Sequence, residues 1–251
     1  MQNTNPIFKK VNEETKDQPI AYGASYLGIS LKTLLFLALL LVGALGSFFL
    51  LANYPTIYVG VLIGSLFTAF IAVMIASFVP RLAAPFGAVY SLSEGVILGM
   101  ITLIYMASFP EFNIVGLAAL ITIGIFAGML VLYSTKLIVV TSRFRRIMLG
   151  ISFGLLFSII TVSLVGLFDG GQMYYVLFGD VNSPLVLFIS LLFIAYGAFV
   201  LVMHFDEARQ VVSHGADKKY EWIVALGLVV STVYIFIQVL RLLAILLSRR
   251  D

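Results

Sequence analysis

Long apolar runs, separated by short polar breaks, fill almost the whole chain after its first 30 residues. A membrane-spanning helix needs about 20 mostly apolar residues, and seven runs meet or approach that length. They are too long for the strands of a membrane barrel, which need only about 10 residues of alternating polarity. The breaks carry Asn, Pro, Gly and Asp, which are typical of turns. The pattern predicts an all-α membrane protein with helices over 34–52, 57–79, 84–106, 114–135, 147–168, 184–203 and 222–247.

The composition supports a membrane protein. Hydrophobic residues make up 61% of the chain and charged residues 11%, whereas a soluble domain carries roughly 25% charged residues. The first 30 residues are polar and lack the apolar core of a signal peptide. We therefore expect a polar N-terminal segment over 1–30 and one transmembrane domain over 31–251, with the first helix as its own insertion signal.

The distribution of Lys and Arg predicts the orientation, because cytoplasmic loops of membrane proteins are enriched in both. If the N-terminus is cytoplasmic, 12 of the 15 basic residues fall in cytoplasmic segments and none in an outside segment between helices. The other three, Arg241, Arg249 and Arg250, lie at the C-terminal end, which seven crossings place outside. The basic net charge thus indicates topology in a cell membrane, with the lipid bilayer as partner, and not nucleic-acid binding.

Glu94 lies close to the middle of the third run, where an ionisable group costs roughly 2.5–3.5 kcal/mol on insertion scales. Isolated in hydrocarbon, its carboxyl group would be protonated, because loss of solvent disfavours the charged form. One interpretation is a group that binds a cation or carries a proton. The other is a structural acid that is hydrogen bonded or paired with a distant arginine.

Asp206 and Glu207 follow the sixth run, beside His204, which can titrate near neutral pH. Asp206 is one helical turn from Arg209 and Gln210. These residues form either an ion or proton site or a solvated helix end with a local ion pair.

A polar stripe follows one face of the seventh run, because Ser231, Tyr234, Gln238 and Arg241 are spaced three, four and three residues apart. Such a face is expected to contact protein or water and not lipid. It either lines a water-filled path or forms a structural seam of hydrogen bonds. If its end of the helix is outside, Arg241 has Glu111, Asp169 and Asp180 as candidate partners.

The start of the seventh run carries residues typical of a helix end at the membrane surface. Glu221 is expected to complement the helix N-terminus, and Tyr220 and Trp222 to lie at the membrane interface. Glycines four residues apart predict close packing between helices. These pairs are Gly60 and Gly64, Gly95 and Gly99, Gly124 and Gly128, and Gly150 and Gly154.

The sequence contains no motif for catalysis or for cofactor binding. The two histidines lie outside any zinc spacing, and there is no nucleophile motif and no phosphate-binding loop. The chain has no cysteine, which excludes thiolate metal sites. We therefore expect a protein that is not an enzyme and that has no cofactor.

Three stretches resemble the Bax inhibitor family, also called the transmembrane Bax inhibitor motif family, and in particular its bacterial members. They are RLAAPFGAVYSLSEGVILG, STKLIVVTSRFRR and MHFDEARQVVSHGADKKYEWIVALGLVVSTVYIFIQVLRLLAILL, and the resemblance covers roughly residues 30–248. It implies a seven-helix bundle with the last helix central. It also implies a calcium leak that responds to pH, with calcium and protons as permeant partners.

The resemblance further implies a pH-sensing pair of aspartates on the last two helices. Asp206 matches the first, and Ser231 stands where the second is expected. Two acids that share a proton titrate as a coupled pair, and an Asp–Ser pair does not. Either Glu94 or Glu221 supplies the second carboxylate, or the pH response is altered or lost.

Calcium is bound by several oxygen ligands, and four acids are candidates for a cation pathway. Asp206, which we expect to be a calcium ligand, is predicted to cluster with Glu207 and Glu221 at the cytoplasmic mouth, with Glu94 deeper. In the closed form Asp206 is expected to pair with Arg81 or Arg209.

Two other functions are compatible with the sequence. The protein is then either a regulator that binds a membrane-protein partner, such as a membrane protease, or a secondary transporter. The charged N-terminal segment and the loop between the last two helices are the expected surfaces of a regulator. A transporter is less favoured because the chain has no visible internal repeat.

Overall fold

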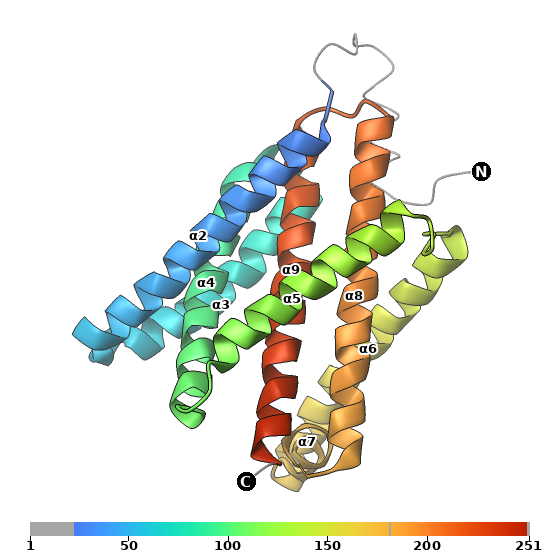
Figure 1. Ribbon diagram of the computed structural model, residues 1–251. Coiled ribbons are helices and arrows are strands. Elements are labelled where there is room, and N and C mark those ends of the chain that lie inside the picture. Colours follow the sequence, from blue (N-terminus) through green and yellow to red (C-terminus); the bar gives the residue numbers. More distant parts are fainter. Residues whose placement is uncertain (1–22, 181, 250–251) are drawn as a thin grey trace. The chain divides into compact units, whose positions relative to one another are not determined.

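The computed structural model describes residues 23–180 and 182–249. Among these residues, seven helices are long and apolar enough to cross a membrane (Figure 1). The prediction of an all-α protein with seven spans is confirmed. The helices are α2 (Tyr26–Asn53), α3 (Pro55–Phe78), α4 (Ala83–Ser108), α5 (Ile114–Ser134), α6 (Ser142–Asp169), α8 (Pro184–Ser213) and α9 (Lys219–Ser248). Three short helical elements join them, namely η3 (Pro80–Leu82), α7 (Gln172–Tyr174) and η4 (Tyr175–Gly179).

Several helices extend beyond the apolar runs that predict them. Before α2, Ser25 caps the helix by accepting a hydrogen bond from the backbone N–H of Gly28, so the helix begins ahead of its apolar run. At the other end of the chain, α8 continues past Met203 as far as Ser213. Hydropathy marks only the part of a helix that matches hydrocarbon, whereas backbone hydrogen bonds continue into the polar region.

Small polar side chains inside the helices bond to their own backbone. Thr33, Ser91, Thr122 and Ser190 are buried, and each hydroxyl donates to the carbonyl oxygen four residues earlier. Hydrocarbon offers no water as a partner, and this local bond satisfies the hydroxyl donor. These residues are therefore compatible with spans that are otherwise apolar.

The described residues fall into two compact units. The first contains α2, α3, α4 up to Ile104, the end of α8 from His204, and α9 up to Val230. The second contains α5, α6, α8 up to Met203, and α9 from Ser231. In the most apolar 18-residue stretch of α9, 61% of the residues are buried, against at most 33% in the corresponding stretches of the other six spans. More of α9 is therefore covered by protein than of any other described span.

In the first unit, α2 and α4 approach closely because glycines lie at their contact. A Cβ added to Gly95 would lie 2.9 Å from the carbonyl carbon of Leu40, and one added to Gly99 would lie 2.6 Å from the Cβ of Ser47. The predicted close packing is thus confirmed for this pair. It is not found for the other three glycine pairs. Among the described residues, no atom of a neighbouring helix lies within 4 Å of the Cβ positions of Gly60, Gly64, Gly124, Gly128, Gly150 and Gly154.

In the second unit, tyrosines connect the helices. The ring of Tyr196 on α8 meets that of Tyr234 on α9 edge to face, with centroids 5.9 Å apart. The hydroxyl group of Tyr196 also forms a 2.8 Å hydrogen bond with the Ser152 hydroxyl on α6. Three helices of this unit are therefore joined by one aromatic side chain.

Candidate functional site

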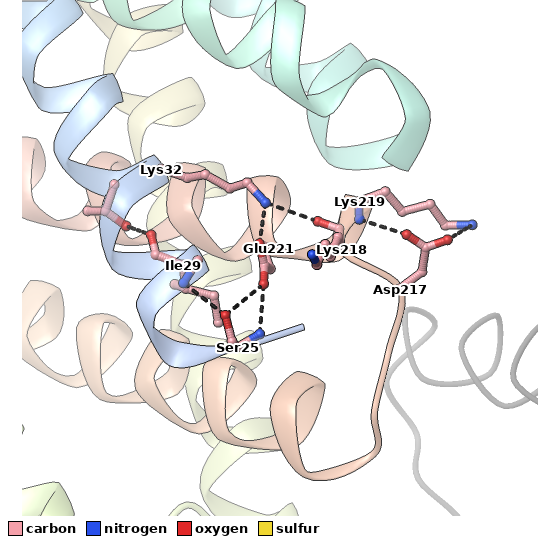
Figure 2. A network of polar contacts seen from close by, with 9 residues as sticks. Ser25, Ile29, Lys32, Asp217, Lys218, Lys219 and Glu221 are labelled. Carbon is pink, nitrogen blue, oxygen red and sulfur yellow. Dashed lines mark hydrogen bonds and ion pairs between the residues drawn. The ribbon is translucent and has the colours of Figure 1, made fainter. Parts of the chain in front are cut away.

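The most complete polar arrangement in the first unit surrounds Glu221, in the first turn of α9 (Figure 2). Its Oε1 accepts hydrogen bonds from the backbone N–H of Ser25, at 2.7 Å, and from the Ser25 hydroxyl, at 3.3 Å. Its Oε2 forms an ion pair with the ammonium group of Lys32 on α2. The same ammonium group donates to the carbonyl oxygen of Lys218 at 3.3 Å. We call Ser25, Lys32, Lys218 and Glu221 the Glu221 cluster.

The local sequence brings the start of α2 against this carboxylate. Gly28 has no side chain, and an added Cβ would overlap with the Glu221 carboxyl group. Just before the helix, the N–H of Ala24 donates to the carbonyl oxygen of Ala216 at 2.7 Å, and Gly23 pairs with Asp217. The start of α2 is therefore held to the α8–α9 junction by backbone bonds and by the Glu221 cluster.

The aromatic side chains on either side of Glu221 are in contact with other parts of the protein. Trp222 packs against Phe36 of α2, with ring centroids 5.5 Å apart, and the Lys32 ammonium lies 4.8 Å from the Trp222 ring centroid. Tyr220 is 1% exposed. The ring of Tyr220 is therefore enclosed by protein, and its position at the membrane interface stays a prediction.

Asp206 is buried inside α8 and does not lie at a solvated helix end. Its side chain is 8% exposed, and its Oδ2 accepts a hydrogen bond from the side-chain amide of Gln210. The amide oxygen of Gln210 is buried without a hydrogen-bond partner among the described residues. The helix continues for about two turns beyond Asp206, to Ser213.

His204 and Glu207 form a second polar pair on α8. The imidazole Nδ1 lies 2.9 Å from Oε2 of Glu207, and both side chains are half-buried. Across from them on α9, a Cβ on Gly227 would lie 2.6 Å from this imidazole ring. Glycine at position 227 therefore provides the space that the imidazole occupies.

Glu94 lies within the buried side of α4. Tyr90, Ser91 and Leu98, which flank it on the helical surface, are all buried. Glu94 itself is half-buried, and it interacts electrostatically with Tyr90, one turn away. Its carboxyl group is thus surrounded on α4 by interior positions.

The stripe on α9 contains polar oxygen atoms for which the described part of the chain provides no hydrogen-bond partner. Ser231 is 2% exposed. Neither its hydroxyl group nor the side-chain oxygen of Gln238 has a hydrogen-bond partner among the described residues. A buried polar group without a partner costs about 1–3 kcal/mol. Such atoms fit a position where water or an ion approaches.

Arg241, at the end of the stripe, is bound by a backbone carbonyl and an aromatic ring. Its Nη2 donates to the carbonyl oxygen of Phe178 at 3.0 Å, and its guanidinium lies 5.1 Å from the Phe178 ring centroid. Arg249 similarly donates to the carbonyl oxygen of Ser183 at 2.6 Å. The sequence suggested acids as partners of Arg241, but Asp169 and Asp180 accept hydrogen bonds from backbone N–H groups within their own turns.

The remaining candidates do not assemble into a metal centre. Arg81, in η3, and Arg209, on α8, are exposed. Within the described residues, no group of three or more His, Cys, Asp or Glu is placed to hold a metal ion. A calcium-binding role for Asp206, together with Glu207 and Glu221, stays a prediction.

Lys32 and Ser25 are the residues of this region that the sequence did not single out. Lys32 counts as a topology signal in the positive-inside pattern, and its partner Glu221 is 189 residues away. The one local signal was Ser25 itself, because serine is a favoured N-cap residue at the start of a helix.

Comparison with known proteins gives one match. A family model described as Bax inhibitor 1 like matches residues 5–248. No curated protein and no solved structure matched the chain.

Proposed function

This chain belongs to the Bax inhibitor 1 like family, and from that premise we propose that it is a pH-modulated calcium leak in a bacterial cell membrane. We place it in the inner membrane as a multi-pass protein with a cytoplasmic N-terminus. The positive-inside pattern of Lys and Arg supports this orientation.

The observation that carries the proposal is the burial of Asp206 within a helix long enough to span the membrane. A carboxyl group inside a span is expensive and is by default a functional candidate. Asp206 is held by Gln210, whose own amide oxygen has no hydrogen-bond partner in the described chain. A passing cation or water molecule would complete the bonding of this polar group.

Two further features support a route for cations. In the first unit, Glu94 lies on the buried side of α4. In the second unit, Ser231 and Gln238 of α9 present buried oxygen atoms that have no hydrogen-bond partner among the described residues. Calcium is bound through carboxylate and amide or carbonyl oxygens together with water. Protonation of Asp206 or Glu94 would remove negative charge that attracts the cation, and calcium flux would therefore depend on pH.

The test is calcium flux into liposomes that contain the purified protein, measured between about pH 6 and 8. We expect flux that depends on pH, and a change of about tenfold, equivalent to about 1.4 kcal/mol, in Asp206→Asn or Glu94→Gln. Asp217→Asn is the matched control, because Asp217 is an exposed acid in the α8–α9 turn. It should leave the flux unchanged.

Absence of flux above that of empty liposomes, at every pH, would contradict the leak. The regulator that binds a membrane-protein partner would then be the better hypothesis. Equal effects of Asp206→Asn and Asp217→Asn would instead contradict the role given to Asp206.

A further inference from the structure

The loop between α5 and α6 carries basic residues that no acid in the neighbouring sequence balances. Lys136 lies in the loop, and Arg143 and Arg146 lie near the start of α6, whereas residues 112–168 include no Asp or Glu. These three side chains are exposed, and they form no ion pair or hydrogen bond with the part of the chain that the structure describes. Arg145 lies on a different face of the helix and is half-buried. We call Lys136, Arg143 and Arg146 the α5–α6 basic cluster.

Backbone bonds and aromatic packing fix the conformation of this region. The N–H groups of Lys136 and Ile138 donate to carbonyl oxygens in the last turn of α5, at 3.0 and 3.1 Å. At the start of α6, the Thr141 hydroxyl caps the helix by accepting a hydrogen bond from the N–H of Phe144 at 3.1 Å. The ring of Phe144 packs edge to face against Phe199 of α8, with centroids 5.9 Å apart. The basic cluster is therefore presented by a folded loop.

Arg143 and Arg146 stand at the end of a helix face that is apolar and uncovered. They share this face because residues three apart are neighbours on a helix, and Ile147 and Phe157, which continue it, are both exposed. In the most apolar 18-residue stretch of α6, 6% of the residues are buried, the smallest share among the seven described spans. Lipid acyl chains therefore cover the face that ends in two guanidinium groups.

The position of the loop brings lipid phosphates within reach of the cluster. The loop joins two membrane spans, and irregular backbone exposed to lipid lies outside the hydrocarbon region, so the loop lies beside the hydrated headgroup layer. Leu137 and Val139 are 75% and 58% exposed, and apolar side chains mixed with basic ones are typical of segments at this depth. Basic residues next to a span attract anionic lipids.

We propose that the α5–α6 basic cluster binds the phosphate of an anionic phospholipid, whose acyl chains lie along the exposed face of α6. Guanidinium groups bind phosphate through charge-assisted hydrogen bonds, and Lys136 adds a third positive charge. The proposal concerns lipid recognition in the second unit and is independent of whether the protein conducts calcium.

A second copy of the chain is the other candidate to cover this face of α6. Gly150 and Gly154 lie on it, and no atom of a neighbouring helix within the described chain lies within 4 Å of their Cβ positions. However, a symmetric pair of α6 helices related by an axis along the membrane normal would bring Arg143 and Arg146 of both copies together. No acid is available there to balance them, and like charges repel. An anionic lipid balances the charge and is the partner that fits.

Native mass spectrometry of the full chain in neutral detergent tests the proposal, because it counts the lipids bound to each protein. The probes are phosphatidylglycerol, which is anionic, and phosphatidylcholine, which has no net charge. In Arg143→Gln combined with Arg146→Gln, we expect the affinity for phosphatidylglycerol to fall about thirtyfold, from about fivefold for each charge removed. The affinity for phosphatidylcholine should stay unchanged.

Charge-matched controls separate this site from general attraction to a basic protein. Arg81→Gln combined with Lys218→Gln removes two exposed charges from other turns on the predicted cytoplasmic side and should keep the parent affinity for phosphatidylglycerol. Equal losses in the two double variants overturn the proposal. Where Arg143→Gln combined with Arg146→Gln does not fold, each single variant gives the same test with a loss of about fivefold.

Two further measurements distinguish the lipid from other occupants. Inorganic phosphate at millimolar concentration should leave phosphatidylglycerol bound, and its displacement would assign the cluster to a free anion and overturn the proposal. The chain has no cysteine, so Ile147→Cys places one thiol on the α6 face. We expect no disulfide between copies when membranes are oxidised. A disulfide in high yield would show that a second copy covers this face, which also overturns the proposal.

Discussion

Lys32 and Glu221 form an ion pair whose members differ in their access to water. Glu221 is almost fully buried, whereas Lys32 has a long flexible stem and is partly exposed. Loss of Lys32 leaves a carboxylate without a partner in the interior, and removing one member of a buried pair costs roughly 3–5 kcal/mol. Loss of Glu221 leaves an ammonium group that can reach water by extending its stem.

We therefore expect an asymmetry in stability. Lys32→Met should lower the free energy of unfolding in detergent more than Glu221→Gln does, in buffer free of divalent cations. The double variant should be more stable than Lys32→Met, because it contains no unpaired buried charge. Equal losses in the two single variants would show that burial of the carboxylate does not govern this pair.

Ser231 stands where the family is expected to carry its second aspartate, and it offers a test of the pH response. Ser231→Asp adds a carboxyl group at a buried position on α9. A carboxyl group that shares a proton with a neighbouring acid loses that proton at higher pH, so the pH profile of calcium flux should shift toward higher pH. Ser231→Asn has nearly the same shape without the charge and should keep the parent profile. An unchanged profile in Ser231→Asp would remove position 231 from the pH response.

At the scale of the elements, hydropathy predicted every spanning helix but not the residues at which the helices begin and end. The first predicted run begins at residue 34, because Lys32 and Thr33 interrupt the apolar pattern, whereas the helix begins at Tyr26, after the Ser25 cap. The short elements α7 and η4 were not predicted either. Three to five residues carry too little periodicity to distinguish a helical turn from a loop.

Packing between elements was predictable only in part. Four glycine pairs had the same spacing, yet only Gly95 and Gly99 lie at a helix contact among the described residues. The spacing records that a close approach is possible, and the facing helix decides whether it occurs. Here the facing surface is α2, with Gly43 at the contact.

Gly43→Ala tests this contact. A Cβ at position 43 would lie 3.1 Å from the Cα of Gly95 and would overlap with the carbonyl oxygen of Leu92. Because both are backbone atoms, the helices must separate, and we expect a loss of about 1–3 kcal/mol in the free energy of unfolding. Gly46→Ala is the matched control on the same helix, since no described atom lies within 4 Å of its added Cβ. Equal stability of the two variants would contradict the close α2–α4 contact.

At the scale of the whole chain, composition and the order of the runs were enough to predict the fold class. The family was predicted from the resemblance of three sequence stretches, and the match over residues 5–248 confirms it. The candidate acids were also visible, since any charge within an apolar run stands out. The Glu221 cluster was not predictable, because Ser25 and Lys32 are 196 and 189 residues from their partner. Neither residue is unusual in its own segment, and only the folded chain brings them together.

The three-dimensional structure also bears on the one conflict that the positive-inside pattern left, namely the basic residues at the C-terminal end. Arg241 and Arg249 donate to the carbonyl oxygens of Phe178 and Ser183, in the segment between α6 and α8. Their guanidinium groups are bonded to carbonyl oxygens of the protein. They therefore differ from the unbonded loop residues that the positive-inside rule counts. The end of α9 therefore lies on the same side of the membrane as Ser183.

Single cysteines can test this placement, since the chain has none of its own. With a cytoplasmic N-terminus and seven crossings, an impermeant thiol reagent should label Asn182→Cys and Ser248→Cys in intact cells. Leu137→Cys, in the exposed α5–α6 loop, should be labelled only after the cells are opened. If Ser248→Cys behaved as Leu137→Cys does, α9 would not cross the membrane, and the bond between Arg249 and Ser183 could not exist in the cell. Labelling of Ser248→Cys together with Asn182→Cys would instead place the basic end of α9 outside, on the side that the bonds of Arg241 and Arg249 to the α6–α8 segment require.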